Sequence, residues 1–287
     1  MTIAATPTAA RRRTDTTAAL GLGAAVVALY VPVLRELVAV WLHVTYYSYG
    51  FLVPVFSAYL VLDALRDDVR ADRGGRMSEL HGGGLVMMAA GLAVLGLGVA
   101  AGSLALRTLS LPVVLLGVAL TTLGPALARR LAFPIGFLVL MTPLPDGVLP
   151  ALSLPLQQLA AFVAEHALRA LGIAVARDEL FLKLPSVTLH VTEACNGLRF
   201  LLAMLVIGTA FAATTQRRPW RRAAIVAAAV AVALLANLAR VTGTGVMAEL
   251  WGAGAAIGLP HVIWGKVVYV AALVPFIAFV LIMRRRA

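Results

Sequence analysis

The sequence predicts an all-α polytopic membrane protein with about eight transmembrane helices, and three observations support this class. Of the 287 residues, 61% are apolar and only 13% are charged, whereas a soluble domain is roughly half apolar and about a quarter charged. The mean hydropathy is +0.94. The apolar residues form runs of about 20, long enough to cross the hydrocarbon layer, without the alternation of membrane-barrel strands. A soluble globular protein and a porin-like barrel are therefore excluded.

The individual spans are bounded by polar residues. Residues 1–16 are polar and basic, and no small-residue cleavage site follows at the usual distance, so we interpret 17–42 as an uncleaved first span. Residues 153–171 have a helical pattern interrupted by polar residues, which predicts a helix at the membrane interface. The interrupting residues are Gln157, Gln158, Glu165, His166 and Arg169. The other spans are expected at 49–65, 83–102, 104–124, 131–149, 197–213, 223–241 and 262–283.

In a soluble protein, a net charge of +11 would suggest binding to nucleic acid. Here the positions of the basic residues instead predict the membrane topology, and no nucleic-acid partner is expected. Sixteen of the 24 basic residues form five clusters, and eight spans place every cluster on one side, the cytoplasm by the positive-inside rule. Both termini then lie in the cytoplasm, and we expect the protein to reside in the cell membrane. If residues 153–171 crossed the membrane instead, the basic clusters before and after this segment would lie on opposite sides of it. The clusters are Arg11, Arg12 and Arg13; Arg66, Arg70, Arg73 and Arg76; Arg129 and Arg130; Arg217, Arg218, Arg221 and Arg222; and Arg284, Arg285 and Arg286.

The outer, non-cytoplasmic side receives the long segment 143–195 and the loop 243–261. Apolar and polar residues alternate over 187–192, which predicts a strand just outside the membrane. No internal repeat or long linker divides the chain. We therefore expect a basic N-terminus at 1–16 and one membrane domain at 17–287, with its active-site half at 131–283.

Eight basic residues lie outside the clusters, and charges inside or at the edge of a span are functional candidates. Arg240 ends an apolar run that rises about 27 Å from Arg222, which places it at the outer face. The alternative is an anchor that extends its charge to the membrane boundary. The eight are Arg35, Arg107, Arg169, Arg177, Lys183, Arg199, Arg240 and Lys266.

Cys195 is the only cysteine, which excludes an intramolecular disulfide and a paired-cysteine metal site. It begins the next span at the outer face. Thr192 is a plausible helix cap, and this would place Cys195 in a first helical turn that favours a thiolate, with Arg199 one turn later on the same face. Glu193 either caps this helix or orients a neighbour. The alternative for Cys195 is a buried structural residue.

His261 opens the final span at the same face, although a lone histidine there also serves as a hydrogen-bonding anchor. Cys195, Arg240 and His261 come from three spans and converge on one membrane depth. They supply a nucleophile, a cation for an oxyanion and a proton shuttle, the groups needed for acyl transfer through a thioester. The sequence has no HExxH pattern, so neither a metal nor another cofactor is expected.

Six separate motifs follow one another along the chain: YSYGFLVPVFSAYL at 47–60, MTPLP at 141–145, LGIAV at 171–175, LPSVTLHVTEACNGLRF at 184–200, ANLARV at 236–241 and HVIWGK at 261–266. In order and spacing they resemble the exosortase and archaeosortase family of polytopic membrane cysteine transpeptidases. The resemblance covers nearly the whole chain after the first span. The chain carries Asn196 and Tyr49 where many relatives carry Ser and His.

The resemblance implies that Cys195, Arg240 and His261 form the active site, with Asn196, Arg199, Glu193 and Gly197 in support. It implies exported proteins as substrates, recognised by a C-terminal signal that consists of a short motif such as Pro-Glu-Pro, a hydrophobic helix and a basic tail. The acyl group would pass to a surface polymer or lipid. Two alternatives remain: a transporter with Arg240, Arg199 and Lys266 along an anion pathway, and a non-catalytic scaffold of an export or polysaccharide system.

Overall fold

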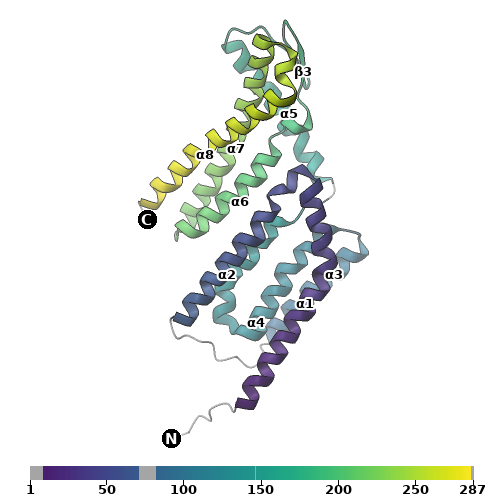
Figure 1. The fold of residues 1–287 in the computed structure, drawn as a ribbon, viewed down its shortest axis with the longest axis vertical. Helices are drawn as coiled ribbons and strands as arrows, with labels where there is room; N and C mark the ends of the chain where they lie inside the picture. Colours follow the sequence, from purple (N-terminus) through teal and green to yellow (C-terminus); the bar gives the residue numbers. More distant parts are fainter. Residues whose placement is uncertain (1–8, 71–81, 146, 286–287) are drawn as a thin grey trace. The chain divides into compact units, whose positions relative to one another are not determined.

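A computed structural model describes residues 9–70, 82–145 and 147–285 (Figure 1). Within these residues, eight helices are long and apolar enough to cross a membrane, which confirms the predicted class. The chain divides into two compact units, Met1–Pro145 and Asp146–Ala287. A single membrane domain at 17–287 stays a prediction. Of the predicted basic clusters, Arg73, Arg76 and Arg286 lie outside the described residues, as does part of the N-terminal segment 1–16.

The first unit is a set of packed helices. Its closest pair is α3 and α4, which approach because glycines line the contact: a Cβ on Gly91 would lie 2.6 Å from Val114 Cγ2, and one on Gly117 would lie 2.7 Å from the Met88 nitrogen. The elements are α1 (Ala9–His43), η1 (Thr45–Phe51), α2 (Leu52–Arg70), α3 (Gly82–Ala100), α4 (Leu104–Phe137) and η2 (Leu138–Met141).

Helix α4 is interrupted at Gly124, whose φ of 80° and ψ of 169° are not helical. Pro125 follows and cannot donate the next backbone hydrogen bond, so the two residues together produce the kink. The part after the kink lies along α2, where Ser57 Oγ donates to the Pro134 carbonyl at 2.8 Å. The expected separate span at 131–149 is therefore wrong in its bounds, because helical structure there ends with η2 and α5 begins at residue 148.

The second unit combines long helices with a small sheet, and α6, α7 and α8 run side by side in Figure 1. The sheet is antiparallel in the order β1-β2-β3. The expected strand is confirmed at β3, whereas the hairpin of β1 and β2 was not predicted. The elements are α5 (Val148–Ala170), β1 (Ala176–Asp178), β2 (Phe181–Lys183), β3 (Thr188–His190), η3 (Glu193–Cys195), α6 (Leu198–Thr215), α7 (Pro219–Trp251), η4 (Ala253–Ala256) and α8 (Gly258–Arg285).

Helix α7 continues well past the point where the sequence predicted its end. The expected span stopped at residue 241 and the expected loop covered 243–261, but α7 extends to Trp251 and α8 begins at Gly258. Two glycines in this extension have a packing role, because Trp264 occupies the place of a Gly243 side chain and Leu168 lies against Gly245. Tertiary contacts therefore stabilise a helical segment that has weak intrinsic propensity.

Helix α5 packs on this extension and on the sheet. Its buried alanines and Leu168 share one hydrophobic cluster with Leu182, Val191 and Val241. The eight described helices that are long and apolar enough to cross a membrane include α5 and count α4 with η2 as one, so they differ from the predicted spans at these two places. The buried face of α5 contacts the end of α7 that lies beyond Arg240. The interfacial placement of 153–171 stays a prediction that this packing supports.

Candidate active site

Cys195 lies at the end of a 3-10 turn and not in the first turn of an α-helix. The turn η3 covers Glu193–Cys195, and Gly197, with φ of 76°, separates it from α6. Thr192 precedes the turn without a capping hydrogen bond from its side chain, and its Oγ1 instead donates to Cys195 Sγ at 3.9 Å. The predicted cap and the predicted shared helical face of Cys195 and Arg199 are therefore wrong, because the left-handed glycine interrupts the helix.

Two side chains from α7 hold the backbone of this turn. Asn237 Nδ2 donates to the Cys195 carbonyl at 2.9 Å, and Arg240 Nη1 donates to the Ala194 carbonyl, also at 2.9 Å. Gly197 permits this approach, because a Cβ there would lie 2.5 Å from Asn237 Cγ. The nucleophile candidate is thus fixed to the helix that carries the cation.

Arg240 also contacts His261, the third candidate. Arg240 Nη2 lies 3.0 Å from His261 Nε2. A guanidinium has only donors, so Nε2 accepts this hydrogen bond and the neutral imidazole carries its proton on Nδ1. Nδ1 is buried and has no hydrogen-bond partner among the described residues. The structure therefore brings the predicted cation and the predicted proton shuttle into direct contact.

The remaining contacts of Arg240 come from neutral groups. Its carbonyl accepts hydrogen bonds from Trp264 Nε1 and from Thr244 Oγ1, both at 2.9 Å. The guanidinium lies over the Phe200 ring, 5.7 Å from its centroid. A Cβ on Gly265 would lie 3.0 Å from Arg240 Nε, so the absence of a side chain there leaves room for the guanidinium. Within the described part of the chain, Arg240 has no carboxylate in ion-pair contact.

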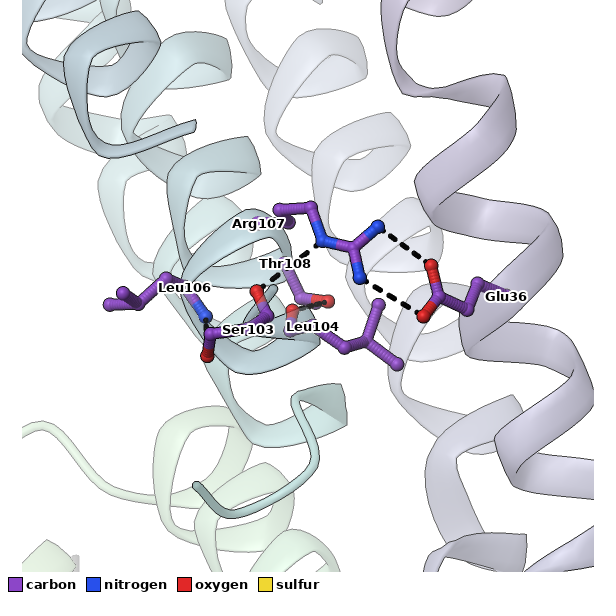
Figure 2. Close-up of polar contacts among 6 residues, drawn as sticks. All are labelled: Glu36, Ser103, Leu104, Leu106, Arg107 and Thr108. Atoms are coloured by element: carbon purple, nitrogen blue, oxygen red, sulfur yellow. Dashed lines mark hydrogen bonds and ion pairs between the residues drawn. The ribbon is translucent and has the colours of Figure 1, made fainter. Parts of the chain in front are cut away.

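Four of the other unclustered basic residues form ion pairs with carboxylates instead. In the first unit, the Arg107 guanidinium binds both carboxylate oxygens of Glu36, as Figure 2 shows. In the sheet, the Lys183 ammonium holds the pKa of the Asp178 carboxyl below its ordinary value, by a hydrogen bond and by charge attraction. The pairs and their shortest distances are Arg107–Glu36 at 2.7 Å, Arg169–Glu165 at 2.8 Å, Arg177–Glu165 at 3.0 Å and Lys183–Asp178 at 2.8 Å.

The predicted supporting residues have different positions. Asn196 is buried, its Nδ2 donates to Ser153 Oγ at 2.7 Å, and its Oδ1 accepts from the Leu198 amide at 2.8 Å. Glu193 begins η3, and Arg199 is exposed in the first turn of α6. Asn196 therefore ties the turn to its neighbours.

The sequence interpretation missed several residues that contact the three candidates, namely Asn237, Phe200, Trp264, Thr244 and Gly265. Asn237 precedes Arg240 by three positions, and this spacing already places both on one face of a helix. The other contacts depend on how α6, α7 and α8 pack, which no local pattern gives. Among the described residues, no group of three or more His, Cys, Asp or Glu could hold a metal ion.

The three candidate residues lie within a stretch that is similar to a known membrane-protein family. A family model described as transmembrane exosortase matches residues 41–278, which include Cys195, Arg240 and His261. No curated protein and no solved structure matches the chain.

Proposed function

The chain belongs to the transmembrane exosortase family, and on this basis we propose that it is a membrane cysteine transpeptidase with Cys195, Arg240 and His261 as its catalytic residues. The observation that carries the proposal is the position of Arg240. One guanidinium contacts both the residue before Cys195 and the imidazole of His261. A nucleophile, a cation and a base from three separate helical segments are thereby linked through one side chain.

In the first step, Cys195 gives its proton to His261 and its sulfur attacks the substrate carbonyl. In the resting site, Arg240 occupies the Nε2 lone pair that would take this proton. As negative charge develops on the carbonyl oxygen, the guanidinium transfers a hydrogen bond from His261 to the oxyanion. The same movement frees Nε2, so proton transfer and oxyanion stabilisation are coupled through Arg240.

The imidazolium then protonates the departing amine, and the C–N bond breaks to leave a thioester on Cys195. An acceptor nucleophile enters, gives its proton to His261 and takes the acyl group, which restores the thiol after the proton returns to sulfur. Arg240 alone is assigned to the oxyanion, because the Asn196 amide is buried and bonded to Ser153.

The proposed substrates are exported proteins with a C-terminal signal of a short motif such as Pro-Glu-Pro, a hydrophobic helix and a basic tail, and the proposed acceptor is a surface polymer or lipid. The order of elements supports a site on the non-cytoplasmic face of the cell membrane. In the second unit, the basic residues at 217–222 and 284–285 lie at the ends of α7 and α8 opposite to Arg240 and His261.

Mass spectrometry of the C-termini of exported proteins tests this proposal in cells that carry either the wild-type protein or Cys195→Ala. We expect the variant to accumulate precursors that keep the hydrophobic helix and the basic tail, and the wild-type termini then give the cleavage position. Identical C-termini, with both proteins at equal levels and no paralogue present, would show that Cys195 is not the nucleophile.

A further inference from the structure

A second group of polar side chains lies beside the nucleophile turn and contacts it from α5, whereas Arg240 contacts it from α7. Ser153 and Gln157 occupy α5, and Asn196 follows Cys195 directly. Their exposed fractions are 3%, 6% and 2%. Buried amides and hydroxyls are unfavourable unless they form hydrogen bonds, so three of them together require a reason.

The buried stripe of α5 changes its chemistry near the turn. Towards the C-terminal end it is mostly apolar, with Ala160, Ala161, Ala164 and Leu168 in the hydrophobic cluster, and the buried Glu165 there forms ion pairs with two arginines. At its N-terminal end the same face carries Ser153 and Gln157, spaced i and i+4. Packing alone would favour apolar side chains at these positions too, and the two polar ones occur where the stripe reaches Asn196.

The hydrogen bonds converge on one oxygen. Ser153 Oγ accepts from Asn196 Nδ2 at 2.7 Å and from Gln157 Nε2 at 2.8 Å, which uses both lone pairs of the hydroxyl. Asn196 Oδ1 accepts the Leu198 amide at the start of α6. Asn196 is thus bound to α5 through one end of its amide and to α6 through the other.

We propose that Ser153 and Gln157 are positioning residues that hold the Cys195 turn through Asn196. Arg240 and Asn237 fix the carbonyls of residues 194 and 195 from α7, and Ser153 fixes the next side chain from α5. The turn is therefore held from two helices. Loss of the α5 contact leaves the turn held by α7 alone, so the thiol moves more relative to Arg240.

This inference rests on the proposed function, because a positioning residue requires a nucleophile to position. Its test does not need a substrate. The chain has one cysteine, so the rate at which N-ethylmaleimide alkylates purified full-length protein in detergent reports on Cys195 alone. Mass spectrometry gives the rate constant, and a melting curve of each variant gives its stability.

Ser153→Ala should raise the alkylation rate constant at least about fivefold, because the loosened turn exposes the thiol more often. With a purified exported protein as substrate, chosen from those whose cleavage position the mass spectrometry gives, kcat should fall about tenfold while KM changes less than about twofold. Ser153→Thr keeps the hydroxyl, so it should restore the wild-type alkylation rate and the wild-type kcat. Ser57→Ala removes a buried serine hydrogen bond in the first unit and should leave the alkylation rate unchanged, which separates positioning from general loss of stability.

The adjacent glutamines provide a matched pair that does not depend on the folding of Ser153→Ala. Gln157 is buried and bonded to Ser153, whereas Gln158 is exposed. Gln157→Leu should accelerate alkylation and Gln158→Leu should not. Equal rates in these two variants, or a wild-type rate in folded Ser153→Ala, would overturn the inference and leave the proposed function intact. Normal processing by Cys195→Ala would remove the proposed function whatever the alkylation rates are.

A double variant tests whether Ser153 acts on the turn through Asn196. If Ser153 acts through Asn196, then Ser153→Ala should add little to the alkylation rate of Asn196→Ala. Independent, multiplicative effects of the two substitutions would show that Ser153 does not act through Asn196 and would overturn that part of the inference.

Discussion

Arg107 in the first unit and Arg240 in the second are both unclustered arginines in long apolar helices, and their surroundings differ. Arg107 forms two charge-assisted hydrogen bonds to Glu36, at 2.7 and 3.0 Å (Figure 2). Arg240 donates instead to a backbone carbonyl and an imidazole. A carboxylate neutralises the first cation, whereas neutral acceptors leave the charge of the second available. The comparison indicates that Arg107 joins two helices and that Arg240 can stabilise a developing negative charge.

The largest effect is expected from Arg240→Lys. An ammonium lacks the planar fork that reaches both the Ala194 carbonyl and His261, so processing should fall about 100- to 1,000-fold while the protein still folds. Quantification of precursor and product C-termini measures this change. Arg107→Lys is the matched control and should process substrate at close to the wild-type rate. Equal losses in the two variants would contradict the distinction between them.

A smaller loss should follow from Gly265→Ala. The added methyl would lie 3.0 Å from Arg240 Nε, so the guanidinium must shift by a few tenths of an ångström. We expect about a tenfold loss of kcat with little change in KM, because catalytic geometry is sensitive to such displacements. Gly254→Ala is the control, since a Cβ there meets nothing within 4 Å. Unchanged kcat in Gly265→Ala would mean that the position of Arg240 does not limit the reaction.

The Arg107 pair should affect stability and not chemistry. Glu36→Gln removes the charge of the acceptor, and we expect about 1–2 kcal/mol less free energy of unfolding with normal processing per folded molecule. Thermal denaturation in detergent gives the change. The double variant Glu36→Gln and Arg107→Gln should recover part of the loss, because it leaves no unpaired charge. A processing defect in folded Glu36→Gln would assign this pair a catalytic role.

The smallest effect is expected on stability, from the exposed ion pair of Lys183 and Asp178 in the sheet. Lys183 lowers the pKa of Asp178, so the pair stabilises the fold above the ordinary aspartate pKa and loses this contribution as the pH falls through the lowered value. Both side chains are more than half exposed, so solvent screens the attraction. Lys183→Gln should leave processing unchanged and slightly reduce the melting temperature at pH 7, and this reduction should shrink as the pH is lowered below the ordinary aspartate pKa. A clear loss of processing would place this edge of the sheet in the site.

The sequence predicted the membrane class and a strand over 187–192, which the structure shows at 188–190, because hydropathy and alternation are local properties. It also predicted that Cys195, Arg240 and His261 meet at one depth, and the structure shows Arg240 in contact with His261 and with the residue before Cys195. The end of α7 was not predictable, since Gly243 and Gly245 lower helix propensity and only their contacts with Trp264 and Leu168 explain the extension.

The conformation of the Cys195 turn also depends on distant residues. Thr192 and the apolar residues after Cys195 suggested one continuous helix, but Gly197 adopts a left-handed conformation against Asn237. Likewise, the polar residues of α5 indicated an interfacial helix, whereas the buried contact of Ser153 with Asn196 needed the fold. Local patterns identified the segments, and tertiary contacts determined how the candidate nucleophile is held.

The thioester on Cys195 is the central claim, and hydroxylamine tests it most directly. This nucleophile attacks thioesters and leaves a C-terminal hydroxamate on the released protein. Mass spectrometry of exported proteins from cells treated with hydroxylamine should find hydroxamates at the cleavage position with wild-type protein and none with Cys195→Ala. Cleavage that continues in the presence of hydroxylamine and yields only free carboxylates would contradict a thioester intermediate.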